Sequence, residues 1–204
     1  MPANTSRSPS GASPLSIPRD PIPVGSAARL GSPSARLGLI IYSDFQCPYC
    51  KRFTLETLPK IRAEYVDTGL VAVFFKHLPL SMHEYAESAA EAAECARRQG
   101  RFWEMHDSIF GNQDDLDGST VVTIATTLRL ELADFRSCLD GQAVDVVQAD
   151  AAEAGALGIK GTPAFLFGEV LSSGNVRVTQ TLRGAAPLED FRERLNVLVK
   201  KLDE

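Results

Sequence analysis

Two cysteines separated by two residues follow directly on an apolar stretch of the chain. They belong to the motif Cys-Pro-Tyr-Cys at residues 47–50. Before the motif, residues 37–45 are β-branched and apolar enough for a strand buried on both faces. After it, large apolar residues recur at helical spacing through residues 51–68. The motif therefore lies beyond the carboxyl end of a buried strand and at the start of a helix, where open α/β sheets place their chemistry.

The predicted start of this helix favours an ionised thiol at Cys47. Pro48 suits the first helical position, so Cys47 becomes the N-cap and its sulfur faces the free amides of Tyr49 and Cys50. A helix dipole is too weak to lower a thiol pKa by several units, so we expect amide-to-sulfur hydrogen bonds to contribute more. Cys50 follows on the same side, closer to the core. We therefore predict Cys47 as the exposed nucleophile and Cys50 as the resolving thiol.

Thiol redox chemistry is the interpretation that we favour for this motif. A four-thiolate zinc site would need a second cysteine pair at short spacing, and the other two cysteines, Cys95 and Cys138, lie far apart in the chain. A structural short-loop disulfide is a second alternative. A cysteine-histidine hydrolase would need a histidine beside Cys47, where Cys50 would promote oxidation. We expect no metal and no organic cofactor.

The rest of the chain predicts further strands and a long block of helices. The strand that we expect over residues 70–76 follows the first one through a helix, which makes a right-handed parallel crossover. Ser81 can cap the first helix of the block. The further elements that we expect are an antiparallel hairpin over 164–167 and 176–182, and helices over 82–99, 102–110, 119–129, 132–140, 144–158 and from Pro187.

The first 36 residues differ from the rest in composition and charge. They hold seven of the twelve prolines and eight serines, so we interpret residues 1–36 as a flexible leader and residues 37–204 as the folded domain. They contain no apolar stretch of signal-peptide length, so either the chain stays in the cytoplasm or a signal was removed. Residues 37–204 carry 17 basic against 25 acidic side chains, which argues against nucleic-acid binding.

Four short motifs together resemble one known family. They are SDFQCPYC at 43–50, LPL at 78–80, QGRFW at 99–103 and GTP at 161–163. From about Val24 to Leu202 the chain resembles the DsbA-like branch of the thioredoxin superfamily. The resemblance implies a thioredoxin fold of the α/β class, with a mixed central sheet and an inserted helical subdomain at about residues 82–140.

The resemblance also implies which residues form the site. It places a cis peptide bond between Thr162 and Pro163, packed against the cysteine pair, with the Thr162 backbone offering an edge to an extended substrate segment. The residues implied for catalysis are Cys47, Cys50 and Pro163, and those implied for client binding are Pro48, Tyr49 and Thr162.

The chain departs from the family pattern at two places. The best-known oxidant of the family has histidine between its cysteines, whereas Tyr49 carries no charge, so we expect an intermediate redox potential. The family also often buries an acid beneath the site, yet Ile41 is apolar. Asp44 is the nearest carboxylate, with Lys76 as its expected partner. We favour a loop-start cap for Asp44 over proton transfer as a general base.

Cys95 and Cys138 leave two interpretations open. Both lie at apolar or small-residue helical positions, and we favour inert core thiols because free cysteine is among the most buried residue types. The alternative is a structural disulfide between two helices of the insertion. A disulfide would imply an oxidising compartment, and a Cα separation above about 7 Å would exclude it.

These features predict a monomeric thiol-disulfide oxidoreductase. Its expected clients are unfolded or secreted proteins with cysteine pairs, which it would oxidise through a Cys47–Cys50 disulfide and a mixed disulfide. A redox partner, for which a membrane protein is one candidate, would recycle it. If a signal was removed, the location would be periplasmic or otherwise extracytoplasmic. A reductase or isomerase using the same site, and a non-catalytic client-binding module, are the alternatives.

Overall fold

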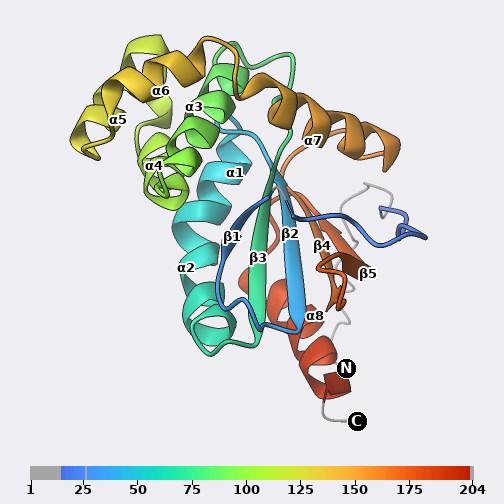
Figure 1. The fold of residues 1–204 in the computed structure, drawn as a ribbon. Coiled ribbons are helices and arrows are strands. Elements are labelled where there is room, and N and C mark those ends of the chain that lie inside the picture. Colours follow the sequence, from blue (N-terminus) through green and yellow to red (C-terminus); the bar gives the residue numbers. More distant parts are fainter. Residues whose placement is uncertain (1–14, 26, 203–204) are drawn as a thin grey trace, which may run out of the picture.

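A mixed five-stranded sheet forms the centre of the computed structural model, which describes residues 15–25 and 27–202 (Figure 1). Across the sheet the strand order is β1-β3-β2-β4-β5. The β2–β3 pair is parallel, and the pairs β1–β3, β2–β4 and β4–β5 are antiparallel. The strands are β1 (Ala28–Leu30), β2 (Leu37–Ser43), β3 (Val71–His77), β4 (Ala164–Val170) and β5 (Val176–Arg183). The predicted parallel crossover and terminal hairpin are confirmed.

The connection from β2 to β3 is helical, as its apolar spacing predicts. It begins with α1 (Pro48–Arg52) and continues through the π-helical turn η1 (Phe53–Thr57). It ends with α2 (Leu58–Ile61) and a second π-helical turn, η2 (Arg62–Val66). The cysteine motif therefore lies at the junction between the central strand and this long helical segment.

All seven residues of β2 are buried because both faces of the sheet are covered. On one face, Leu39 and Ile41 pack in a cluster with Phe53 from the β2–β3 connection and with Phe191 from α8 (Leu188–Leu202). On the other face, Tyr42 and its alternate neighbour Ile40 pack in a cluster with residues of α7 (Val144–Ala156) and of the segment 15–24. Alternate side chains of a strand point to opposite faces, so this strand carries two cores.

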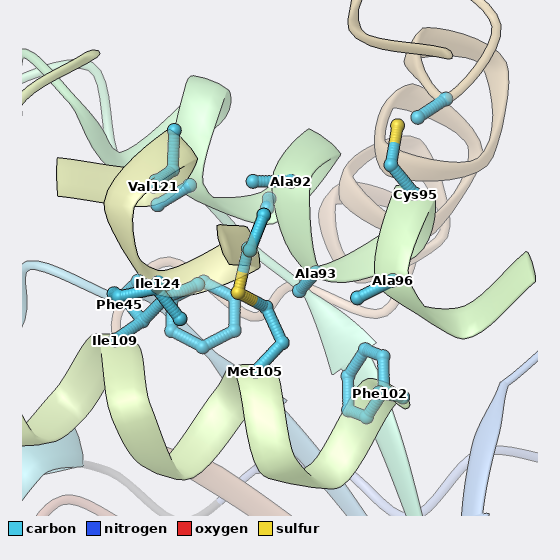
Figure 2. Packing of buried hydrophobic residues seen from close by; sticks show 14 of the residues in the cluster. Phe45, Ala92, Ala93, Cys95, Ala96, Phe102, Met105, Ile109, Val121 and Ile124 are labelled. Atoms are coloured by element: carbon cyan, nitrogen blue, oxygen red, sulfur yellow. The ribbon is translucent and has the colours of Figure 1, made fainter. Parts of the chain in front are cut away.

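The block between β3 and β4 contains five α-helices within the described residues. They are α3 (Ala86–Arg98), α4 (Phe102–Gly111), α5 (Gly118–Thr127), α6 (Leu132–Leu139) and α7 (Val144–Ala156), with a 3₁₀ turn, η3 (Gln113–Asp115), between α4 and α5. Figure 2 shows Met105 of α4 directed at the alanines of α3, which allow the two helices to approach closely. The expected fold class, an α/β thioredoxin fold with a helical insertion, is confirmed.

Helix α3 begins later than the sequence predicts. Its N-cap is Tyr85 rather than Ser81. The intervening residues 78–85 form a loop, whose amides at Leu80 and Tyr85 donate to side chains next to the cysteine motif, on Asp44 and Gln46. Residues 82–85, for which the sequence predicts the first turn of the helix, therefore belong to this loop.

Much of the segment interpreted as a flexible leader is part of the fold. Leu15, Ile22 and Val24 are buried against the sheet, and Ile22 forms a β-bridge with Val176. Strand β1 pairs with β3. The prediction is therefore wrong for residues 15–25 and 27–36, because a few apolar side chains spaced among prolines are enough to cover a sheet edge and face. Residues 1–14 lie outside the described part.

Cys95 of α3 and Cys138 of α6 form a disulfide with their Cα atoms 5.7 Å apart. The interpretation as inert core thiols is therefore wrong, and the alternative disulfide is the correct one. The apolar spacing of each helix shows that both sulfurs point inward, but it cannot show that they face each other.

Candidate active site

The cysteine motif adopts the helix start that its proline predicts. Cys47 is the N-cap of α1, with φ −73° and ψ 121°, and Pro48 occupies the first helical turn. The Cys47 amide donates to the Asp44 carbonyl at 3.1 Å, and the Cys47 carbonyl accepts from the amides of Cys50 and Lys51 at 3.0 and 3.1 Å. These bonds close the turn between β2 and α1, and they hold both cysteines at its inner side.

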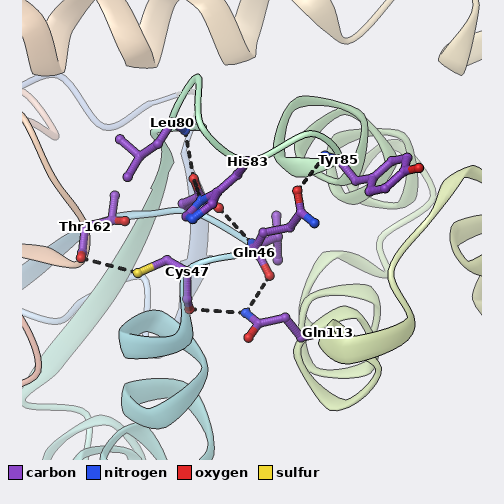
Figure 3. Close-up of polar contacts among 9 residues, drawn as sticks. Gln46, Cys47, Leu80, His83, Tyr85, Gln113 and Thr162 are labelled. Carbon is purple, nitrogen blue, oxygen red and sulfur yellow. Dashed lines mark hydrogen bonds and ion pairs between the residues drawn. The ribbon is translucent and has the colours of Figure 1, made fainter.

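Both thiols of the motif are free, and both are buried. Cys50 is 1% exposed and Cys47 is 4% exposed. Cys47 is therefore the more exposed of the two thiols, as expected, but the prediction that it is openly exposed is wrong. The loop before β4 lies over this sulfur, and Cys47 Sγ donates to the Thr162 carbonyl at 3.4 Å (Figure 3).

The two thiols have pKa values displaced in opposite directions. A hydrogen bond from the Cys50 thiol is the largest cause that lowers the pKa of Cys47 to about 6. The Thr162 side chain and the amides of Cys50 and Tyr49 lower it further, against the opposing effect of burial. Burial, followed by the neighbouring Cys47, raises the pKa of Cys50 well above its ordinary value. Cys47 is therefore the thiol that is ionised near neutral pH.

The origin of the low pKa differs from the sequence-based expectation. We expected amide-to-sulfur hydrogen bonds to supply the larger share, but the amides of Cys50 and Tyr49 lower the pKa of Cys47 less than the Cys50 thiol does, and the Cys47 side chain lacks the geometry of a cap hydrogen bond to them. The larger contribution comes from the partner thiol. An N-cap pattern in the sequence identifies the amides near Cys47. It does not show whether those amides or the Cys50 side chain, one turn away, lower the pKa more.

The loop before β4 has the geometry that the family resemblance implies. The Thr162–Pro163 peptide bond is cis. Pro163 is buried, and its carbonyl accepts from the Gly184 amide at 2.8 Å. Around the sulfur, Pro48 is exposed and Tyr49 is 56% exposed, so apolar side chains reach solvent close to Cys47.

The Asp44 carboxylate links the loop of residues 78–85 to the active-site turn through hydrogen bonds. Its Oδ1 accepts from the Gln46 amide at 2.7 Å, and its Oδ2 accepts from the Leu80 amide at 2.7 Å and contacts His83 Nδ1 at 2.8 Å (Figure 3). This is the loop-start cap that the sequence favours. The Asp44 backbone amide, rather than its carboxylate, is the group that interacts with Cys50.

Lys76 does not pair with Asp44, so that prediction is wrong. Lys76 Nζ lies 3.3 Å from Asp150 Oδ1 and 2.7 Å from Glu153 Oε1, and Tyr42 donates to the same Glu153 oxygen. Asp150 and Glu153 come from α7, which covers the sheet face on which Lys76 points. Strand alternation fixes that face, but the sequence does not reveal which helix covers it.

Gln113 is a residue of the site that the sequence does not single out. It comes from η3, and its Nε2 donates to the carbonyls of Phe45 and Cys47 at 2.7 and 3.1 Å. A lone glutamine between two helices carries no recognisable signal. Another contact to the turn is the Tyr85 amide, which donates to Gln46 Oε1.

The histidines do not form a hydrolase arrangement. His77, His83 and His106 contact Glu94, Asp44 and Asp107 respectively, and no hydrogen bond joins them to either free thiol in the described part of the chain. Within residues 15–25 and 27–202 there is also no group of histidine, cysteine and acidic residues suited to a metal ion.

Comparisons with known proteins agree with this geometry. Residues 24–183 match the model of a protein family described as thioredoxin. The structure of α-DsbA1 from Wolbachia pipientis superposes with a TM-score of 0.78 and 25% identity, over 88% of this chain and 94% of that one. The chain belongs to the DsbA-like oxidoreductases of the thioredoxin superfamily. BdbD from Bacillus subtilis, in its oxidised form, shares the fold with a TM-score of 0.78 and 19% identity, over 92% of this chain and 100% of that one.

This DsbA-like chain also matches segments of much longer proteins. It is 39% identical over 137 residues to an Na⁺/H⁺ antiporter, NhaA 3, from Salinispora tropica, which covers 66% of this chain and 20% of the antiporter. It is 32% identical over 148 residues to NhaA 1 from Mycolicibacterium vanbaalenii, covering 71% of this chain and 24% of that protein. The chain thus spans about a fifth to a quarter of these relatives. In the described residues, the helices are too short or too polar to cross a bilayer.

Proposed function

We propose that the protein oxidises cysteine pairs in unfolded proteins by transferring its Cys47–Cys50 disulfide to them. The observation that carries this proposal is the opposed displacement of the two pKa values, with Cys47 lowered to about 6 and Cys50 raised. A stabilised Cys47 thiolate favours the reduced form of the protein, so its disulfide is a good electron acceptor. The lowered pKa of Cys47 supports a redox potential more oxidising than that of a dithiol with ordinary pKa values.

The transfer needs two exchange steps. A client thiolate attacks Cys47 Sγ, a client–Cys47 disulfide forms, and Cys50 leaves as a thiolate that takes up a proton because its pKa is high. A second client thiolate then attacks the client sulfur of the mixed disulfide. The client disulfide forms, and Cys47 leaves as the stable thiolate. The client loses two electrons, the protein gains them, and an external oxidant or disulfide partner restores the Cys47–Cys50 bond.

The surroundings of Cys47 support clients without a fixed sequence. The sulfur lies against the backbone of Thr162, where an extended segment could pair with the main chain, and Tyr49 offers an exposed apolar surface. The Cys95–Cys138 disulfide supports an extracytoplasmic location, since such bonds persist in oxidising compartments.

Trapping of mixed disulfides tests this function. The oxidised protein is incubated with a reduced, unfolded client, and the formation of client disulfides is followed by alkylation of the remaining thiols. The wild type should oxidise the client with one equivalent of Cys47–Cys50 disulfide consumed for each client disulfide formed. Cys50→Ser, exposed to clients that carry disulfides, should accumulate a covalent adduct through Cys47 because it lacks the resolving thiol.

Cys47→Ser is the matched control and should form no adduct. An absence of adducts with Cys50→Ser, together with no client oxidation by the wild type, would support a non-catalytic binding module instead. Preferential reduction of client disulfides in a glutathione buffer that keeps the clients oxidised would identify a reductase. Repair of mispaired disulfides without net oxidation would identify an isomerase.

A further inference from the structure

We propose that Gln113 is a positioning residue through which the inserted helices hold the active-site turn and set the reactivity of Cys47. The inference rests on the thiol-disulfide chemistry proposed above. It assigns to the helical insertion a direct part in that chemistry, in addition to covering the sheet.

The side-chain hydrogen bonds of Gln113 go to the turn that carries the cysteines. The residue belongs to η3, between α4 and α5, and is 9% exposed. Its single amide nitrogen donates to two backbone carbonyls, those of Phe45 at 2.7 Å and Cys47 at 3.1 Å (Figure 3). The Phe45 carbonyl belongs to the Phe45–Gln46 peptide unit and the Cys47 carbonyl to the Cys47–Pro48 unit, so one side chain holds the two peptide units that flank the Gln46–Cys47 bond.

The Cys47 carbonyl is a functional part of the turn. It also accepts from the amides of Cys50 and Lys51, so the first turn of α1 closes on it. The orientation of this peptide unit determines where the Cys47 side chain points, which is toward the Thr162 carbonyl and the Cys50 thiol. By holding this part of the backbone, Gln113 therefore keeps the Cys47 sulfur directed at the Thr162 carbonyl and the Cys50 thiol.

The Phe45 carbonyl depends on the same donor. Phe45 is buried, and Gln113 Nε2 is the partner found for its carbonyl among the loop and side-chain hydrogen bonds of the described residues. A buried carbonyl without a partner is unfavourable, so loss of the Gln113 amide would favour rearrangement of the turn toward another donor or water. Such a rearrangement would move Cys47 relative to Cys50.

The neighbouring ion pair cannot replace Gln113. Asp114 Oδ2 lies 2.8 Å from Lys51 Nζ, which links η3 to the same turn of α1. The Asp114 side chain is 84% exposed, and exposed ion pairs contribute little to stability. The buried amide is therefore the effective link between the helical insertion and the cysteines.

The test compares Gln113→Met with the wild type. Methionine has the length of glutamine and no hydrogen-bond donor. We expect the pKa of Cys47 to rise by about half a unit to one unit, because the donors around the thiolate lose their alignment. At equilibrium with glutathione, the reduced form should be disfavoured about 3- to 10-fold relative to the wild type, by the same linkage. Both quantities are measured without any client.

Gln99→Met is the matched control. Gln99 also bridges two segments through its amide, contacting the Glu131 amide and carbonyl at 2.8 and 3.3 Å, but it makes no contact with the cysteine turn. It should leave the pKa of Cys47 and the glutathione equilibrium unchanged. If Gln113→Met does not fold, Gln113→Leu serves in its place, since leucine also removes the donor and introduces no charge near Cys47.

The outcomes separate this inference from the proposed function. If the wild type has a low Cys47 pKa and a folded Gln113 variant keeps both the pKa and the equilibrium constant, the positioning role is excluded even if the variant melts at a lower temperature. If the wild-type thiol titrates in the ordinary range, the proposed oxidising function is itself excluded. A shift in the Gln113 variant, with none in Gln99→Met, supports the inference.

Discussion

The Cys50 thiol donates a hydrogen bond to the Cys47 sulfur, and this contact lowers the pKa of Cys47 more than any other. Burial keeps Cys50 protonated, so it remains available as the donor. The two residues therefore have different roles: the Cys47 sulfur is ionised, and the Cys50 sulfur, which is still more deeply buried, stays protonated. Reactivity depends on this pair rather than on the helix start alone.

Removal of the Cys50 donor should raise the pKa of Cys47. We expect Cys50→Ala to shift it from about 6 upward by at least about one unit, toward the ordinary thiol value near 8.5. Cys50→Ser keeps an O–H donor and should retain a lower pKa than Cys50→Ala. The rate of alkylation of Cys47 as a function of pH measures both values. Equal values in the two variants would contradict the role of the donor.

The same pKa values predict how the stability of the reduced protein depends on pH. The pKa of Cys47 is lower in the folded than in the unfolded state, so its contribution is present at alkaline pH and is lost as pH falls through about 6. The raised pKa of Cys50 has the opposite sign and destabilises the fold at strongly alkaline pH. Relative to Cys47→Ser/Cys50→Ser, the reduced wild type should gain stability from about pH 6, the pKa of Cys47 in the folded state, to about pH 8.5, the ordinary pKa of a thiol. Urea unfolding checks this, and a flat difference would refute it.

Replacement of Lys76 should destabilise the fold strongly. Its side chain is 3% exposed and its ammonium group faces Asp150 and Glu153, so Lys76→Met leaves the buried Asp150 carboxylate and the partly exposed Glu153 carboxylate without their cation. We expect a loss of about 3 to 5 kcal/mol in the free energy of unfolding. Lys60→Met, at an exposed position of α2, is the control and should change little. A loss below about 1 kcal/mol for Lys76→Met, measured by urea denaturation, would show that water or protonation relieves the carboxylates.

The Cys95–Cys138 disulfide should stabilise the insertion without tuning the active site. The bond joins residues 43 positions apart, for which chain entropy gives a contribution of about 4 kcal/mol. Cys95→Ala/Cys138→Ala should therefore lower the free energy of unfolding by about 2 to 4 kcal/mol. The pKa of Cys47 should stay at its wild-type value, because neither residue contacts the cysteine turn. A shifted Cys47 pKa in the folded double variant would disprove this separation.

The fold could be predicted from the sequence where hydrophobic spacing determines structure. The continuous apolar run at residues 37–43 predicts a strand buried on two faces, and the structure places helices on both sides of β2. The position of Pro48 predicts Cys47 as the N-cap. Local patterns of this kind depend on residues that are close in sequence, so the sequence alone predicts these elements.

Contacts between distant segments could not be predicted in the same way. The short strand β1 exists because β3 offers it an edge, and the surrounding prolines and serines gave no strand signal. Lys76 reaches α7 instead of Asp44, and Gln113 reaches the cysteine turn from the helical block. Each of these pairings depends on how the helices of the insertion pack on the sheet, which residue spacing leaves undetermined.

The pKa of Cys47 in the reduced wild type tests the account most directly. The ultraviolet absorbance of the thiolate is followed against pH, with Cys47→Ser as the reference for the remaining groups. A transition near pH 6 is predicted, because the Cys50 thiol and the surrounding donors stabilise the charged sulfur. A transition at the ordinary thiol value of about 8.5 would contradict it.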